Sequence, residues 1–211
     1  MHIQSLDDQI SLTVDSPQDA QALAEHLRQD AIWQEVVAGI DTVVVRFDAA
    51  SMNARVAERR VVDVLGNEIP PLPIQGRVLR IPVVYGGEYG PDLDALCQEL
   101  GMTQDEFIAL HTGNEYSVDM VGFTPGFAFI GGLAERLHVP RREQPRQRVA
   151  AGSVGIADGR TGIYALPSPG GWTLIGRTPH PLFDPQADDP FPIHAGTRIR
   201  FVAVAADVFS E

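Results

Sequence analysis

The fold is decided by the stretch G-F-T-P-G-F-A-F-I-G-G-L, which spans residues 122–133. Two comparable stretches follow it, A-G-S-V-G-I-A-D-G-R-T-G-I-Y at 151–164 and S-P-G-G-W-T-L-I-G-R-T-P at 168–179. In each, short apolar runs are joined by glycine and proline, which favour turns and close approach of the backbone. Many short strands joined by such turns are typical of a closed β-barrel. We therefore predict a barrel whose site is built mainly from loops and backbone amides.

The barrel is expected to occupy residues 81–211. Its candidate strands lie at 116–121, 127–130, 163–166, 172–176 and 198–204. Two short helices are expected before them, at 91–100 and 103–111. Thr103 and Glu106 form a capping box at the start of the second helix, and the apolar spacing of the first helix places Cys97 in the core.

Residues 1–80 have the pattern of a smaller α+β domain. Ser16 before Pro17 marks a helix start, the β-branched run at 41–47 indicates a buried strand, and Ser51 is a candidate cap for a second helix. The order strand, helix, strand, helix, strand predicts a ferredoxin-like layer. The proline-rich stretch at 66–76 is expected to be a linker or a hairpin tip.

Composition excludes several classes of protein. The 211 residues are 44% hydrophobic and carry a net charge of −12, which argues against a nucleic-acid partner. No apolar run reaches the roughly 20 residues of a membrane span. The single cysteine agrees with a reducing compartment, and we expect a cytoplasmic protein.

All 16 basic residues are arginines. The absence of lysine excludes a Walker A phosphate loop and Schiff-base catalysis. Five of the arginines are concentrated in one segment, which is interpreted either as an anion-binding site or as a solvated loop. They are Arg136, Arg141, Arg142, Arg146 and Arg148.

Two candidate groups of site residues precede residue 130. His111 with Glu115 is interpreted as an acid/base pair or as groups that orient a substrate amide, and alternatively His111 is a helix-terminal imidazolium. The loop containing Phe123, Thr124, Pro125 and Gly126 is expected either to line a pocket, with Thr124 as a hydrogen-bond donor, or to be a simple turn.

Further candidates follow in the glycine-rich stretches. Gly152, Ser153 and Gly155 are interpreted either as a nest of backbone amides for a carboxylate or phosphate, or as a tight turn. Arg177 is expected either to grip such an anion or to form a structural ion pair. No histidine has the spacing of a metal-binding motif, so no metal site is predicted.

Six segments together resemble the B subunit of bacterial ATP-dependent 5-oxoprolinases. The wider family includes the sporulation kinase inhibitor and allophanate hydrolase subunit 1, or carboxyltransferase subdomain C, proteins. The resemblance covers roughly residues 81–204. The segments are Y-G-G-E-Y-G-P-D-L (85–93), H-T-G-N-E-Y (111–116), G-F-T-P-G-F (122–127), A-G-S-V-G-I (151–156), T-G-I-Y (161–164) and S-P-G-G-W-T-L-I-G-R-T-P (168–179).

The resemblance implies a ferredoxin-like N-terminal domain followed by a cyclophilin-like β-barrel. It also implies two partner chains, the A and C subunits of an oxoprolinase complex, and opening of 5-oxo-L-proline to L-glutamate with ATP hydrolysis. ATP would then be shared with a partner chain. Two residues depart from the family pattern. Phe129 stands where many relatives have tyrosine, and Arg160, a candidate ligand-binding residue, stands where glutamine is common.

Three functions remain open on the sequence. The first is a 5-oxoprolinase subunit that is active only with its partners. The second is a binding protein that inhibits a sensor histidine kinase. The third is an amide or allophanate hydrolase subunit, or half of a biotin-dependent carboxyltransferase whose biotin is carried by another chain, because this chain has no acceptor lysine.

Overall fold

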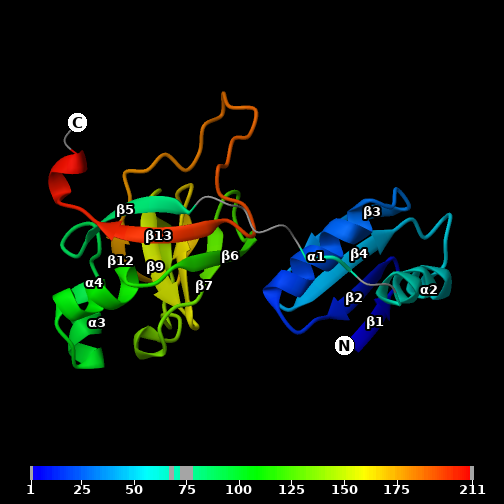
Figure 1. Cartoon of the computed structure of the whole chain (residues 1–211), viewed down its shortest axis with the longest axis horizontal. Helices are drawn as coiled ribbons and strands as arrows, with labels where there is room; N and C mark the ends of the chain where they lie inside the picture. Colours follow the sequence, from blue (N-terminus) through cyan, green and yellow to red (C-terminus); the bar gives the residue numbers. More distant parts are fainter. Residues whose placement is uncertain (1, 67–68, 72–77, 210–211) are drawn as a thin grey trace. The chain divides into compact units, whose positions relative to one another are not determined.

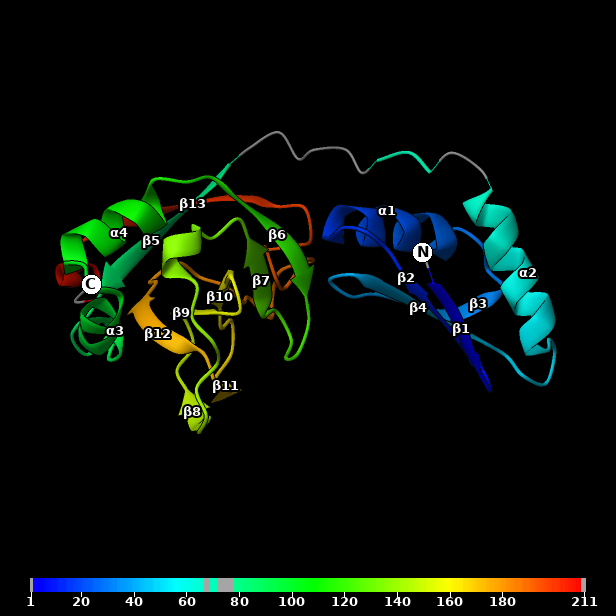
Figure 2. The same cartoon turned by 90° about the horizontal axis from the view of Figure 1, so that it is seen from below.

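The computed structural model describes residues 2–66, 69–71 and 78–209. The chain divides into two compact units, Met1–Ile74 and Gln75–Glu211, shown from two directions in Figures 1 and 2. The domain boundary expected after residue 80 falls inside strand β5 (Leu79–Tyr85), which belongs to the second unit. Most of the linker expected at 66–76 lies outside the described residues.

The first unit contains a four-stranded antiparallel sheet in the order β1-β2-β4-β3. Strands β2 and β3 are both antiparallel to β4, which lies between them, so they run parallel to each other as in a ferredoxin-like layer. The edge beside β2 is filled by β1, which precedes both helices. The expected alternating element order is therefore wrong, because two strands precede the first helix. The strands are β1 (His2–Leu6), β2 (Gln9–Thr13), β3 (Trp33–Ala38) and β4 (Thr42–Phe47).

Two helices cover one face of this sheet (Figure 2). Helix α1 (Pro17–Arg28) begins as predicted, because the Ser16 side chain accepts a hydrogen bond from the Asp19 amide. Helix α2 (Ala54–Leu65) is capped by Asn53 rather than by Ser51. Their apolar faces pack on the buried sheet residues to form the core of the unit.

The second unit is built around a closed seven-stranded barrel in the order β10-β7-β6-β13-β5-β12-β9. This confirms the mixed α+β fold with a barrel. Strand β6 lies where the sequence predicts it, whereas the strand expected at 163–166 is instead β10, which ends at Ile163. The strands other than β5 are β6 (Tyr116–Val121), β7 (Ala128–Gly131), β9 (Ser153–Ala157), β10 (Arg160–Ile163), β12 (Thr173–Arg177) and β13 (Arg198–Ala203).

Short elements surround the barrel. Helix α4 (Gln104–Thr112) has the predicted capping box, and Cys97 on α3 (Leu93–Leu100) is buried in the core as predicted. Strands β8 (Arg146–Val149) and β11 (Ser168–Gly170) pair as a separate ribbon. Two 3₁₀ turns complete the unit, η1 (Glu135–Leu137) and η2 (Ala206–Phe209). Over the described part of the chain, every helix is too short or too polar to cross a membrane.

A second apolar cluster is separate from the main barrel core. Gly155 on β9 pairs with Gly162 on β10, and Trp172 lies against both. Phe127 and Trp172 belong to this cluster rather than to the main core, and Phe129 packs against it. Its members are Phe127, Val149, Ala157, Tyr164, Trp172 and Leu174, with Phe129 packed against them.

One glycine fixes the docking of segment 86–92 on β12. A Cβ atom at Gly90 would overlap the carbonyl group of Ile175, and Gly87, at φ 53°, has open space around it. We expect Gly90→Ala to destabilise the chain by about 3 kcal/mol, because two backbones would have to separate. Gly87→Ala is the control and should cost only about 1 kcal/mol, the cost of a left-handed residue. Urea unfolding measures both, and equal losses would contradict this account.

Candidate functional site

Three of the expected site segments meet at one end of the barrel. Strand β6 is antiparallel to β13, β13 is parallel to β5, and β5 is antiparallel to β12. Strands β6 and β12 therefore run in the same direction, and the loop after β6 lies at the same end of the barrel as Arg177 at the end of β12. Ser153 pairs with Arg177, which brings the second glycine-rich stretch to this end as well.

The loop at 122–127 is held rigidly. The amide of Thr124 donates to the carbonyl of Gly122 at 2.8 Å, and the amide of Phe127 donates to the carbonyl of Thr124 at 3.0 Å. Gly126, at φ 73°, packs so closely on Phe191 that a side chain would not fit. The Thr124 hydroxyl is buried without a hydrogen-bond partner among the described residues. Pro125 is exposed beside it.

Phe123 is the exception in this loop. Its φ of 69° is left-handed, a conformation that costs a bulky residue on the order of 1–3 kcal/mol. Its side chain is 66% exposed. Its ring meets Phe127 edge to face at 5.8 Å between centroids. The ring therefore lies on the surface of the isolated chain. That Phe123 lines a pocket stays a prediction.

The second stretch forms a tight turn, not an amide nest. The Ser153 amide donates to the Ala150 carbonyl at 3.2 Å, and the Gly152 amide donates to the Tyr164 carbonyl at 2.7 Å. Gly152 has φ 80°, as the third residue of a type II turn requires. Gly155 lies inside β9, paired with Gly162. The amides of Gly152 and Ser153 are thus used by the fold, and the predicted anion nest is wrong.

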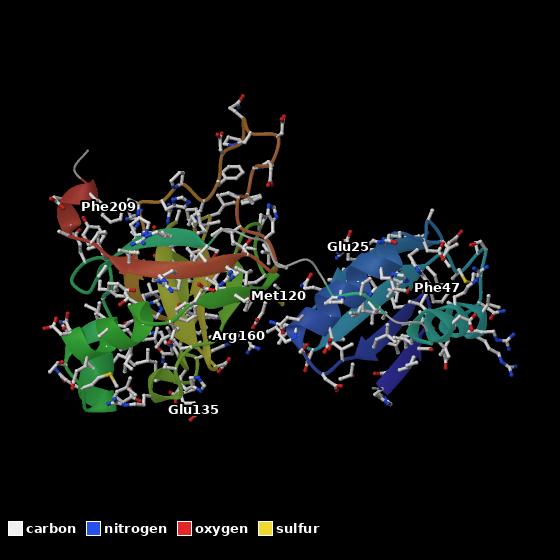
Figure 3. The ribbon with its side chains drawn as sticks, in the orientation of Figure 1. Glu25, Phe47, Met120, Glu135, Arg160 and Phe209 are labelled. Carbon is white, nitrogen blue, oxygen red and sulfur yellow. The ribbon has the colours of Figure 1, made fainter. Side chains whose placement is uncertain are left out.

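Arg177 closes this turn. Its Nε donates to the Ala151 carbonyl at 2.9 Å, and its guanidinium lies over the Phe209 ring at 5.6 Å. Figure 3 shows Phe209 on the C-terminal turn. The same ring stacks on Tyr89 at 4.6 Å between centroids. Among the described residues no carboxylate pairs with Arg177, so its terminal nitrogens remain available to an anion.

His111 lies inside the barrel. Its Nδ1 is 2.7 Å from the Tyr85 hydroxyl and its Nε2 is 3.0 Å from the Thr161 hydroxyl. The Thr161 hydroxyl donates its hydrogen to the Gly155 carbonyl at 3.2 Å, so it accepts from His111. This assigns the proton to Nε2 and makes Nδ1 the acceptor for Tyr85.

Burial keeps His111 neutral. Loss of solvent lowers the pKa of the imidazole to about 3, and the same cause raises the pKa of Tyr85 well above its usual value. A ring with both nitrogens bonded inside a core is not a general base at neutral pH, and it is not an imidazolium either. The acid/base role and the imidazolium expected for His111 are therefore wrong, because the helix end is buried rather than solvated, whereas the orientation of a substrate amide stays a prediction.

Glu115 is directed elsewhere. Its carboxylate accepts from Nε of Arg198 at 2.6 Å and lies 3.8 Å from Nη2 of Arg200. These arginines alternate with buried residues on β13 and so lie on the outside of the barrel. The predicted pairing of Glu115 with His111 does not occur, because the chain between them leads away from the interior.

Arg160 is also paired within the chain. Its Nε donates to the Asp119 carboxylate at 3.0 Å, across Gly131, where a side chain would collide with that carboxylate. Burial raises the pKa of Asp119, and the ion pair with Arg160 opposes that rise. Arg160 (Figure 3) therefore balances a buried charge, and its added positive charge is not free for a ligand.

Three of the five arginines in the arginine-rich segment form ion pairs within the chain. Arg142 and Arg146 both bind one oxygen of Asp92, at 3.0 and 2.6 Å, while the other oxygen accepts from the Leu174 amide at 2.7 Å. Arg141 pairs with Asp158. Neither interpretation of the segment anticipated Asp92, which lies more than 50 positions before Arg146 and carries no local signal. Within the described ranges, acidic, histidine and cysteine side chains form no group of three suited to a metal ion.

We expect the buried histidine to make stability depend on pH. The unfolded chain binds a proton at His111 below its ordinary pKa of 6.5, whereas the folded chain does so only near pH 3. This contribution to stability is therefore complete above pH 6.5 and is lost as the pH falls toward 3, with a slope of about 1.4 kcal/mol per pH unit. The free energy of unfolding, measured in urea between about pH 7 and 4.5, should fall with decreasing pH more steeply for the protein than for His111→Gln, and the difference should equal this slope. If the variant does not fold, ¹⁵N NMR should show a neutral Nε2–H ring at about pH 5, and a protonated ring would contradict the assignment.

Comparison with known proteins adds a family to this geometry. The family described as carboxyltransferase domain, subdomain C and D, matches residues 4–193. The chain is 46% identical over 132 residues to the B subunit of 5-oxoprolinase from Bacillus subtilis, a match that covers 63% of this chain and 55% of that protein. The chain thus spans about half the length of that relative.

Two further matches cover more of the chain. The B subunit of 5-oxoprolinase from Haemophilus influenzae is 40% identical over 181 residues, which is 86% of this chain and 84% of that protein. The crystal structure of TTHA0988 superposes with a TM-score of 0.81 at 32% identity, over 95% of this chain and 41% of that one. The same fold therefore forms part of a longer polypeptide in that structure.

Proposed function

Because the chain belongs to the carboxyltransferase subdomain C and D family, we propose that it is the B-type subunit of an ATP-dependent 5-oxoprolinase. The observation that carries the proposal is the 40% identity, across 86% of this chain, to a protein named as the B subunit of 5-oxoprolinase. The same name supports action in a complex, and the proposed partners are the A and C subunits, in the cytoplasm.

The proposed reaction explains why ATP is needed. The lactam of 5-oxo-L-proline is a poor electrophile, and phosphorylation of its amide oxygen activates the carbonyl carbon. ADP leaves at that step, water then adds to the activated carbon, and the C–N bond breaks so that the nitrogen becomes the amine of a glutamyl acyl phosphate. A second water cleaves this acyl phosphate to L-glutamate and phosphate. The activated lactam has to be protected from bulk water until transfer, which favours a site enclosed between subunits.

The barrel end offers suitable groups for such a substrate. Arg177 presents terminal guanidinium nitrogens, which fit the carboxylate of 5-oxoproline or a phosphate. The Thr124 hydroxyl retains unused hydrogen-bonding capacity for a polar group of the substrate. Since the chain has no lysine, a permanently charged side-chain contact to phosphate from this chain would have to come from arginine.

Reconstitution tests the proposal. The chain is combined with its companion A and C subunits, and glutamate formation from 5-oxoproline is measured with each protein, and then ATP, omitted in turn. We expect turnover only in the complete mixture. Undiminished turnover without this chain, or no turnover from a demonstrably assembled complex, would overturn the proposal.

A substitution tests the role of Arg177. We expect Arg177→Gln to lower kcat/KM of the complex roughly 30-fold or more, because a charged partner of the substrate is lost. Arg177→Lys should restore part of the loss, since it keeps the charge without the fork. Arg200→Gln is the control, an arginine on the outer surface of the barrel. Steady-state kinetics with a thermal melt of each variant separates a binding defect from unfolding, and normal kinetics for Arg177→Gln would exclude this role.

A further inference from the structure

The loop between β6 and β7 holds an aromatic ring in solvent at a cost to the isolated chain. Phe123 is 66% exposed, although its backbone is left-handed at φ 69°. An exposed ring gains no burial, and a left-handed phenylalanine is disfavoured relative to glycine at the same position. The surrounding sequence is rich in glycine, at 122, 126, 131 and 132. A phenylalanine at this left-handed position therefore needs a functional explanation.

The loop does not let the ring relax. Hydrogen bonds close it on itself, including the one from the Gly122 amide to the Phe127 carbonyl at 3.0 Å. Phe127 is buried at the base of the loop, and Gly126 is locked against Phe191. The ring is therefore displayed by a rigid support, so little conformational entropy remains to be lost when it binds.

A second aromatic ring is displayed nearby on the loop after β12. Phe183 is 38% exposed and stacks on Phe191 at 4.8 Å between centroids. Phe191 in turn packs against Gly126, so it connects the two loops. The sequence of the first loop, residues 122–127, contains no charged residue. This end of the barrel thus displays two exposed aromatic rings, the first of them on a loop without charged residues. Aromatic side chains are the type of residue that dominates protein–protein interfaces.

We propose that Phe123 is the anchor by which this barrel binds a partner protein, its ring entering an apolar pocket on that partner. The inference rests on the proposed function within a complex, and it goes further by naming the surface. A polypeptide occupant is favoured over a small ligand because phosphates and 5-oxoproline are polar, whereas the ring and its loop are not. The TTHA0988 chain, of which this fold covers 41%, supports the same occupant, because there the fold is joined to further polypeptide.

Phe123→Gly separates this role from a structural one. Glycine removes the ring and also relieves the left-handed backbone, so the isolated chain should melt at the same temperature or higher. Its affinity for the companion A and C subunits should nevertheless fall at least about 10-fold, measured as Kd by biolayer interferometry. Phe123→Ala removes the ring but keeps the strain, so it should show the same loss of affinity without stabilisation. Leu6→Ala is the matched control, a 57% exposed side chain on β1 of the other unit.

Each outcome decides a separate question. Unchanged affinity of Phe123→Gly, within about 2-fold of wild type, would overturn the inference and leave the proposed function standing. A higher KM for 5-oxoproline with normal assembly would also overturn it, because the ring would then line the substrate site. Failure of the unmodified chain to bind either companion would remove both proposals at once.

Discussion

Two glycines that face each other on adjacent strands, Gly155 and Gly162, determine how the second half of the chain is arranged. Without side chains they leave the outside of the barrel bare, and the ring of Trp172 lies on it. Phe127 packs edge to face against the same ring at 5.3 Å. Phe127 is the base of the loop that carries Phe123, so the display of that ring depends on a flat patch on the neighbouring strands. A Cβ atom at Gly162 would contact both rings and displace them.

Several charged and polar side chains of this unit are paired within the chain, whereas part of its apolar surface is left exposed. The carboxylates of Asp92, Glu115 and Asp119 each bind arginines from distant parts of the chain, and His111 is kept neutral between two hydroxyl groups. These interactions satisfy the polar groups that the fold buries, as folded proteins require. Because His111, Glu115 and Arg160 are occupied by these contacts, they are no longer good candidates for catalytic residues.

The sequence predicted best what depends on near neighbours. Helix α1 and helix α4 start at their predicted caps because Ser16 and Thr103 bond amides three positions away. Strand β5 was missed because Pro82 in its middle argues against a strand, yet β5 pairs on both sides. The roles of the candidate site residues were predicted poorly because their actual partners lie far away in the sequence. Glu115 is paired with Arg198, 83 positions away, and no local pattern encodes such a distance.

Three uncompensated features of the second unit lie at one end of the barrel. There Phe123 is exposed on a strained backbone, and the Thr124 hydroxyl is buried without a partner among the described residues. Arg177, at the end of β12, donates to a carbonyl through Nε, and its guanidinium lies over the Phe209 ring. Folded chains often keep such costs where they serve function, and an exposed apolar ring and a cationic group at the same end of the barrel fit the proposal of a site that a second polypeptide completes. Under the proposed function, the barrel contributes one side of a catalytic site that is shared with a partner subunit.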